Sequence, residues 1–182
     1  HLPTLSATLL LPAGLTAEPA SLPGTAFFTS QVLSLGTRRR NAVALAEDVD
    51  GIGAALSTGS DYDYATVDVT GLSRHATTLL DILAEVVQSP ALLAEEVERR
   101  RSQILGMLER RKDDHSDVVR NRFFDAIYGS HPYHQQKEGT PDSVGKIARE
   151  DLVSFYERTY VPDGSILALV GDLDAQEGIR AS

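Results

Sequence analysis

Two groups of residues have side chains of the kinds that bind metal ions, and we interpret both as polar turns. His131 and His134 are three residues apart, and a second group consists of Asp113, Asp114, His115 and Asp117. A zinc site needs three or four converging ligands. Pro132 breaks helical geometry between the two histidines, and the second group falls between two expected helices. We therefore expect a solvated turn at each position.

The sequence contains none of several other catalytic patterns. It has no cysteine, which excludes thiolate chemistry, disulfides and Cys-based zinc sites. It has no Gly-rich phosphate loop and no Gly-x-Ser-x-Gly elbow. Asp61 and Asp63 flank Tyr62, but paired carboxylates at a turn are usually exposed. Spacing alone therefore predicts no catalytic group.

The composition is that of a folded, acidic, globular protein. Of the 182 residues, 42% are hydrophobic and 24% are charged, and the net charge is −9. An acidic chain repels phosphate backbones, so we expect no nucleic-acid partner. No apolar run reaches the roughly 18 residues of a membrane span, so we expect none. We interpret the early basic run Arg38-Arg39-Arg40 as a solvated helix cap.

Polar and apolar periodicity predicts the elements that would position a site. Alternation predicts strands at 5–11, 54–58 and 64–70, with a hairpin turn at 59–61. The apolar run Ile166 to Val170 predicts a central strand. Helices are predicted at 24–35, 41–52, 79–90, 94–112, 116–127 and 151–160, and from Asp174 onward. Asn41 and Ser116 are the expected N-caps of the second and fifth of these helices.

The order of these elements predicts an α+β fold. One strand, two helices, a hairpin, several helices and a final strand suit a largely antiparallel sheet with helices packed on one face. The length predicts a single domain over residues 1–182.

One segment of the chain resembles the zinc-site helix of the pitrilysin/insulinase family of peptidases, the inverzincins. That helix carries His-x-x-Glu-His inside the frame Gly-x-Ala-His-Phe-x-Glu-His-x-x-x-x-Gly-Thr, and residues 24–37 read GTAFFTSQVLSLGT. The residues of the frame are present, but the two His ligands and the catalytic Glu are not. Phe27 stands at the first His, Ser30 at the Glu and Gln31 at the second His.

The resemblance continues along nearly the whole chain. Further matches, in order, are Gly53–Leu56, Asp63-Tyr64, Glu95–Arg99, His131-Pro132-Tyr133, Gly139-Thr140, Tyr160-Val161-Pro162 and Val170-Gly171-Asp172. The third zinc ligand of the family is a Glu on the long helix, which falls at Gly106 or Met107 here. A thioether suits softer ions than zinc. Glu109, the nearest carboxylate, projects from another side of the helix.

The resemblance implies a non-catalytic member with the fold of the mitochondrial-processing-peptidase-like metallohydrolases. A catalytic zinc needs three protein ligands and an open position for water, and the Glu takes a proton from that water. All three ligands and the base are replaced together, at Phe27, Ser30, Gln31 and Met107. We therefore expect no catalytic residue, no metal ion and no other cofactor.

The resemblance also implies partners. Family members work as paired halves that close around a peptide chamber, so this chain is expected to be the N-terminal half of a two-halved unit, ending near residue 182. It would pair with a zinc-bearing half and share its peptide substrate. In active members an edge strand pairs with the substrate backbone. The matching residues are Leu56, Ser57 and Thr58, although the family usually has Asn near Ser57.

Two other readings stay open at this point. The chain could be an active metallopeptidase that uses relocated ligands such as His75, His115 or His131, or an adaptor unrelated to proteolysis. The compartment is also open, because a chain without cysteine suits the periplasm and the cytoplasm alike.

Overall fold

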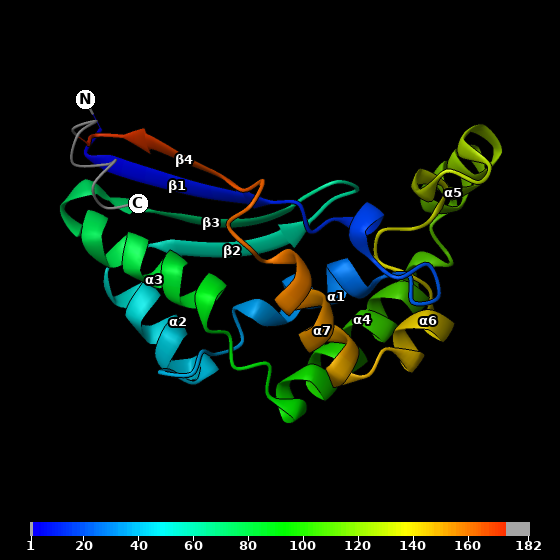
Figure 1. Ribbon diagram of the computed structural model, residues 1–182, viewed down its shortest axis with the longest axis horizontal. Helices are drawn as coiled ribbons and strands as arrows, with labels where there is room; N and C mark the ends of the chain where they lie inside the picture. The colour runs from blue at the N-terminus through cyan, green and yellow to red at the C-terminus, as the bar shows by residue number, and fades with distance from the viewer. Residues whose placement is uncertain (1, 174–182) are drawn as a thin grey trace.

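A four-stranded antiparallel sheet forms one side of the molecule (Figure 1). The computed structural model describes residues 2–173. Its strands are β1 (Thr4–Leu11), β2 (Ala55–Ser60), β3 (Ala65–Leu72) and β4 (Ile166–Gly171). They are arranged in the order β2-β3-β1-β4, and each neighbouring pair is antiparallel.

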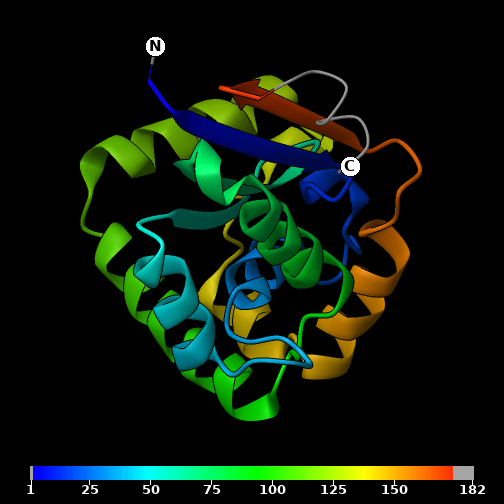
Figure 2. The ribbon, with the colours of Figure 1, turned by 90° about the vertical axis from the view of Figure 1, so that its left-hand side faces the viewer.

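Seven α-helices and three short 3₁₀ turns accompany the described strands. The helices are α1 (Thr25–Leu33), α2 (Ala42–Gly51), α3 (Ala76–Gln88), α4 (Ala94–Arg111), α5 (His115–Tyr128), α6 (Pro141–Lys146) and α7 (Arg149–Thr159). The 3₁₀ turns are η1 (Leu15–Ala17), η2 (Ser73–His75) and η3 (Pro132–His134). Helices α2 and α3 lie under the same face of the sheet in two perpendicular views (Figures 1 and 2). The predicted α+β class, with helices on one face of an antiparallel sheet, is confirmed.

The two faces of the sheet differ in polarity because side chains alternate along each strand. Ala65, Val67 and Val69 of β3 are completely buried against the helices. On the opposite face, Thr8 donates a hydrogen bond to Asp68 at 2.6 Å. The sheet therefore has one core-forming face and one exposed face, on which polar side chains of β1 and β3 bond across the strands.

The described residues pack into two hydrophobic cores. The first lies between the sheet and α3, with Leu79, Ile82 and Val86 fully buried. The second joins α1, α4, α6 and α7, with Phe28 and Leu152 fully buried. The second core places α1 beside α4, the two helices on which the zinc-ligand positions are expected.

Strand β4 corrects one prediction, because it is an edge strand and not a central one. Leu167 and Leu169 pack against the first core. Ile166 and Val170 point to the other face and are 62% and 70% exposed. An unbroken apolar run was the basis for expecting burial on both faces, but in the described structure only one face is covered.

Local chemistry corrects two further predictions. The hairpin turn is at 61–64, since Asp61 N donates to Tyr64 O at 2.7 Å and β2 continues to Ser60. The N-cap of α5 is Asp114, whose carboxylate accepts from the backbone N–H groups of Ser116 and Asp117. Helix α6 was not predicted from the sequence. The Asn41 cap of α2 is confirmed. The helix expected from Asp174 lies outside the described residues.

No helix among residues 2–173 is both long enough and apolar enough to span a membrane.

Candidate functional site

Helix α1, on which three of the four zinc-site positions are expected, is fixed at its N-terminus by Gly24 and Glu18. Gly24 has φ +95°, and a Cβ at this position would lie 2.9 Å from the carbonyl oxygen of Glu138, so only glycine fits without strain. The Glu18 carboxylate accepts hydrogen bonds from Gly24 N at 3.0 Å and Ala26 N at 2.9 Å. A carboxylate here satisfies helix N–H groups that have no partner within the helix.

The pKa of the Glu18 carboxyl is strongly raised. Burial raises its pKa from 4.5 to about 7, and the backbone N–H groups of Ala26 and Gly24 oppose that rise. Desolvation therefore outweighs the stabilisation of the ionised form at the helix N-terminus.

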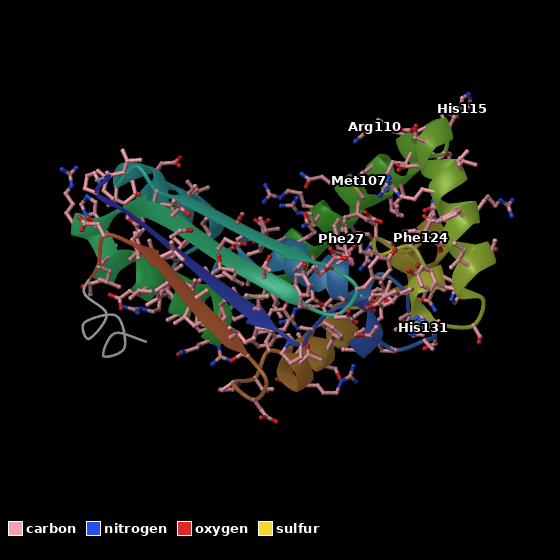
Figure 3. All side chains as sticks on the ribbon, turned by 90° about the horizontal axis from the view of Figure 1, so that it is seen from above. Phe27, Met107, Arg110, His115, Phe124 and His131 are labelled. Carbon is pink, nitrogen blue, oxygen red and sulfur yellow. The ribbon has the colours of Figure 1, made fainter. Side chains whose placement is uncertain are left out.

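Phe27 and Met107, at two of the expected ligand positions, both pack against the second hydrophobic core. Figure 3 shows them on neighbouring helices, Phe27 on α1 and Met107 on α4. Arg101 of α4 lies over the ring of Phe28 at 5.1 Å from its centroid, which adds a cation–π contact between the two helices. The structure therefore brings these family positions to one place, where the two side chains are apolar.

Ser30, at the position expected for the catalytic Glu, is completely buried. Its hydroxyl donates to the carbonyl oxygen of Phe27 at 2.7 Å, so its donor is used inside α1. Gln31 is half-buried on the next position of the helix. Neither side chain can take up a proton from water at neutral pH, because a hydroxyl and an amide are not bases there.

The end of the motif frame is held by a buried ion pair that the sequence did not predict. The Thr37 hydroxyl donates to the carboxylate of Glu85 on α3, and Arg40 also bonds that carboxylate. The Glu85 side chain is 3% exposed and that of Arg40 22%. Asp48 is a second partner of Arg40, at 2.6 Å. The reading of 38–40 as a solvated cap is therefore wrong for Arg40.

This ion pair perturbs both partners in the expected directions. The bond from Arg40 lowers the pKa of Glu85, against the effect of burial. The bond to Glu85 raises the pKa of Arg40. Each charge therefore stabilises the other in a largely buried setting.

The histidines considered as relocated ligands lie on separate elements. His75 is in η2, His115 begins α5, and His131 precedes η3, where its Nδ1 accepts from Tyr133 N at 3.3 Å. Over residues 2–173, no group of three His, Cys, Asp or Glu side chains is placed to hold a metal ion. Because zinc needs at least three converging protein ligands, nothing in this part of the chain supports the relocated-ligand reading.

The acidic and His-containing turns have structural roles. Asp117 pairs with Arg111 of α4. Asp61 pairs with Lys137 at 3.0 Å, and Asp63 accepts a hydrogen bond from the Tyr133 hydroxyl. The carboxylates flanking Tyr62 therefore tie the β2–β3 hairpin to the segment around η3.

Strand β2 holds the three residues expected to contact substrate. It is an edge strand, paired only with β3 in the described sheet. Leu56 packs against the first core, Ser57 is exposed and Thr58 is half-buried. The unpaired edge is the geometry that β-augmentation needs.

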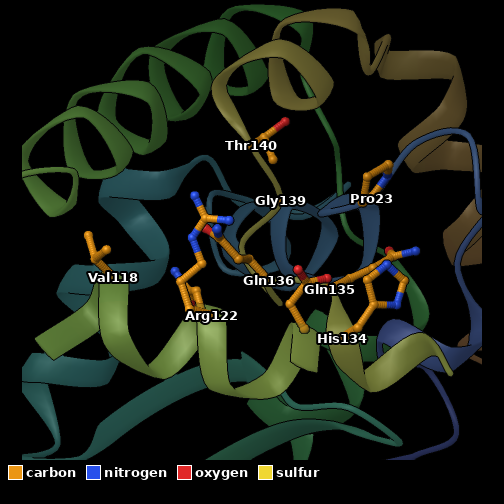
Figure 4. Close-up of a pocket in the computed structure, with 10 residues that line it drawn as sticks. Pro23, Val118, Arg122, His134, Gln135, Gln136, Gly139 and Thr140 are labelled. Atoms are coloured by element: carbon orange, nitrogen blue, oxygen red, sulfur yellow. The ribbon is translucent and has the colours of Figure 1, made fainter. Parts of the chain in front are cut away.

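A cavity of about 430 Å³ lies between α5 and the segment 134–140 (Figure 4). Its lining consists of Pro23, Val118, Asn121, Arg122, Asp125, His134, Gln135, Gln136, Gly139 and Thr140. No sequence pattern indicates this cavity, because its lining comes from segments that only tertiary packing brings together.

Comparisons with known proteins agree with this geometry. The sequence profile of the family described as "Insulinase (Peptidase family M16)" matches residues 3–140. An uncharacterized zinc protease of Mycobacterium leprae is 28% identical over 97% of this chain and 40% of its own length. Bovine cytochrome b-c1 complex subunit 1 is 27% identical over 96% of this chain and 36% of its own length. The chain thus spans less than half of these relatives.

Solved structures share the fold. A peptidase M16 inactive domain from Pseudomonas fluorescens superimposes with a TM-score of 0.93 at 27% identity, covering 100% of this chain and 44% of that one. A protease from Helicobacter pylori gives a TM-score of 0.92 at 21% identity, covering 98% of this chain and 44% of that one.

Proposed function

This chain belongs to the insulinase family of peptidases, family M16, and from that premise we propose that it is a non-catalytic peptidase-like half. In this proposal it pairs with a zinc-bearing half and helps to enclose the peptide that the active half cleaves. We further propose that residues 1–182 are the N-terminal half of a two-halved unit, in keeping with the 40% of the Mycobacterium leprae relative that the match covers.

The observation that carries the proposal is the apolar character of the side chains at two of the expected metal-ligand positions. Phe27 and Met107 face the same hydrophobic core. A ring and a thioether offer no ligand that zinc prefers. Ser30 uses its hydroxyl inside the helix, so no base remains to activate water. One replacement could be compensated by a neighbour, but four replacements at once remove ligands and base together.

Two similarities support the proposal. The Pseudomonas fluorescens structure is called an inactive domain. Bovine cytochrome b-c1 complex subunit 1 is by name a subunit of a larger complex. Both similarities agree with a family fold that can act as a part of an assembly, whether or not the chain itself hydrolyses peptides.

The first experiment measures zinc and hydrolysis together. The purified protein is incubated with zinc, desalted and analysed for metal by atomic absorption, and then tested on a quenched fluorescent peptide with and without chelator. We expect substoichiometric zinc and no chelator-sensitive cleavage. Stoichiometric zinc with chelator-sensitive cleavage by this chain alone would refute the proposal.

A matched variant gives the positive control. Phe27→His, Ser30→Glu, Gln31→His and Met107→Glu together restore the family's residue types on the same helices. If α1 and α4 keep their positions, this variant binds zinc where the parent does not. Circular dichroism checks that the variant is folded.

The second experiment tests the pairing. Affinity-tagged protein is recovered from its source cell, and co-purified chains are sequenced. We expect a partner, or a second half of the same polypeptide, that carries His-x-x-Glu-His. Leu56, Ser57 and Thr58 are proposed to hold the peptide along the edge of β2. Introducing proline at Ser57 would then weaken cleavage by the assembled pair, because proline removes a ladder donor.

A second candidate function is a structural subunit without any link to proteolysis. The similarity to bovine cytochrome b-c1 complex subunit 1 favours it. Recovery of partners that all lack His-x-x-Glu-His, within the same polypeptide and outside it, would select this candidate.

A further inference from the structure

Helix α5 is attached to the rest of the molecule in an unusual way. None of its 14 residues is buried, and the helix stands at the end of the molecule opposite the start of β1 and the end of β4 (Figure 1). The ion pair between Asp117 and Arg111 holds its first turns. Its last turns are held by ring contacts, among them Tyr128 with Tyr133 at 5.4 Å. Between these attachments the inner face of α5 borders open space.

That space consists of three cavities along the helix. They measure about 430, 420 and 170 Å³. Asn121 of α5 and Gln136 of the facing segment line all three. The cavities therefore form one groove between α5 and residues 134–140, large enough for a ligand by the usual size of binding pockets, roughly 300–1,000 Å³.

Five of the polar side chains that line the first cavity have no partner in the described structure. Within residues 2–173, the side chains of Asn121, Arg122, Asp125, Gln135 and Gln136 make no hydrogen bond and no ion pair. Figure 4 shows Arg122 of α5 and Gln136 of the facing segment among the side chains that line the cavity. Polar groups that converge on a cavity without bonding one another are available to a ligand.

The cations around the groove differ in how far they are already neutralised. Arg111 pairs with Asp117 and Glu138, Arg120 pairs with Asp117, and Lys137 pairs with Asp61. Arg122 has no such pair in the described structure, although Asp125 lies one turn further along α5. Arg122 is therefore the positive charge at the groove that an anion can reach without displacing an internal partner.

The chemistry of this lining indicates the ligand. A guanidinium binds a carboxylate through two parallel N–H···O bonds. Primary amides such as those of Asn121, Gln135 and Gln136 both donate and accept, which matches the alternating N–H and C=O groups of an extended peptide. We propose that the groove beside α5 binds a peptide segment and that Arg122 anchors it through a peptide carboxylate.

This inference deepens the proposed function and rests on it, since it assigns the peptide an anchoring point on the non-catalytic half. The carboxylate can come from an Asp or Glu side chain or from the C-terminus of the peptide. Because binding is measured on this chain alone, the outcome does not depend on zinc or on a recovered partner. Failure here would leave the zinc and pairing experiments standing.

The test uses fluorescence anisotropy with three labelled peptides of twelve residues. The first has two central Glu residues and an amidated C-terminus. The second has Gln in place of Glu and a free C-terminal carboxylate, and the third has Gln and an amidated C-terminus. We expect the first or the second to bind about tenfold more tightly than the third, the size of one charge-assisted contact.

Two variants test whether Arg122 binds the carboxylate, and the choice of peptide identifies where that carboxylate lies. Arg122→Gln is expected to remove the preference over the third peptide. Arg110→Gln, an exposed arginine of α4 that does not line the groove, is the matched control and should keep it. The first peptide binding best identifies a side-chain carboxylate, and the second a C-terminal one. Equal binding of all three peptides, or a preference that survives Arg122→Gln, would overturn the proposal.

Discussion

Replacing Glu85 with Gln is expected to lower the free energy of unfolding by about 3 kcal/mol. The carboxylate accepts from Thr37 and Arg40 and is almost fully buried. Removing one partner of a buried ion pair costs about 3–5 kcal/mol, because the other charge stays desolvated. The low end applies here, since Arg40 is 22% exposed and keeps Asp48 as a partner.

Urea unfolding followed by circular dichroism measures this loss. With a urea dependence of about 1–3 kcal/mol per molar, the midpoint should fall by roughly 1–3 M. Glu47→Gln, at an exposed position of α2, is the matched control and should change stability by less than about 0.5 kcal/mol. A change for Glu85→Gln no larger than the control would refute the assignment of this pair as a major stabilising contact.

The pH dependence of the free energy of unfolding tests the same ion pair independently. The pKa of Glu85 is lowered in the folded state, mainly by the bond from Arg40. Its contribution is therefore present above the unfolded pKa, near 4.5, and is lost as pH falls through the folded value. The stability difference between the parent and Glu85→Gln should be constant near neutral pH and shrink in acid. A difference that grew in acid would contradict the pairing.

Three further predictions concern α1. The pKa of Glu18 is raised to about 7, so the folded state holds the proton more tightly than the unfolded state. The free energy of unfolding should therefore fall by at most about 3 kcal/mol as pH rises from 4.5 to 7. Unfolding measured at several pH values should show a flatter profile for Glu18→Gln. Gly24→Ala places a Cβ at 2.9 Å from a carbonyl oxygen at φ +95° and should cost about 2 kcal/mol in urea. Phe28→Ala empties a completely buried site and should cost about 3–5 kcal/mol, measured as a lower thermal midpoint.

Local patterns predicted most elements of this fold. Alternation over 5–11 and 64–70 identified β1 and β3, whose inward residues are buried. Asn41 was correctly identified as a cap because its side chain bonds within three residues. Such features depend on neighbours in the sequence, and the sequence displays those directly.

The features that the sequence did not predict all depend on residues that are far apart in the chain. The edge position of β4 depends on which strand pairs with β1, at a separation of more than 150 residues. The partner of Arg40 is Glu85 of α3, which no spacing rule connects to α1. The groove beside α5 joins three separate segments. Long-range pairing and desolvation decide these features, and both arise only in the folded state.

The residues of the motif frame and those at the metal-ligand positions can change independently, because they have different physical roles. Gly24 is required by a left-handed turn, and Thr37 bonds to the buried Glu85. Neither task involves a metal ion. Phe27 and Met107, at two of the expected ligand positions, instead contribute apolar surface to the second core, so in the proposed function these positions stabilise the fold and bind no metal ion. A chain can therefore lose the site and keep the fold, and the ligand positions must be read one by one before a frame of this kind is taken to indicate hydrolysis.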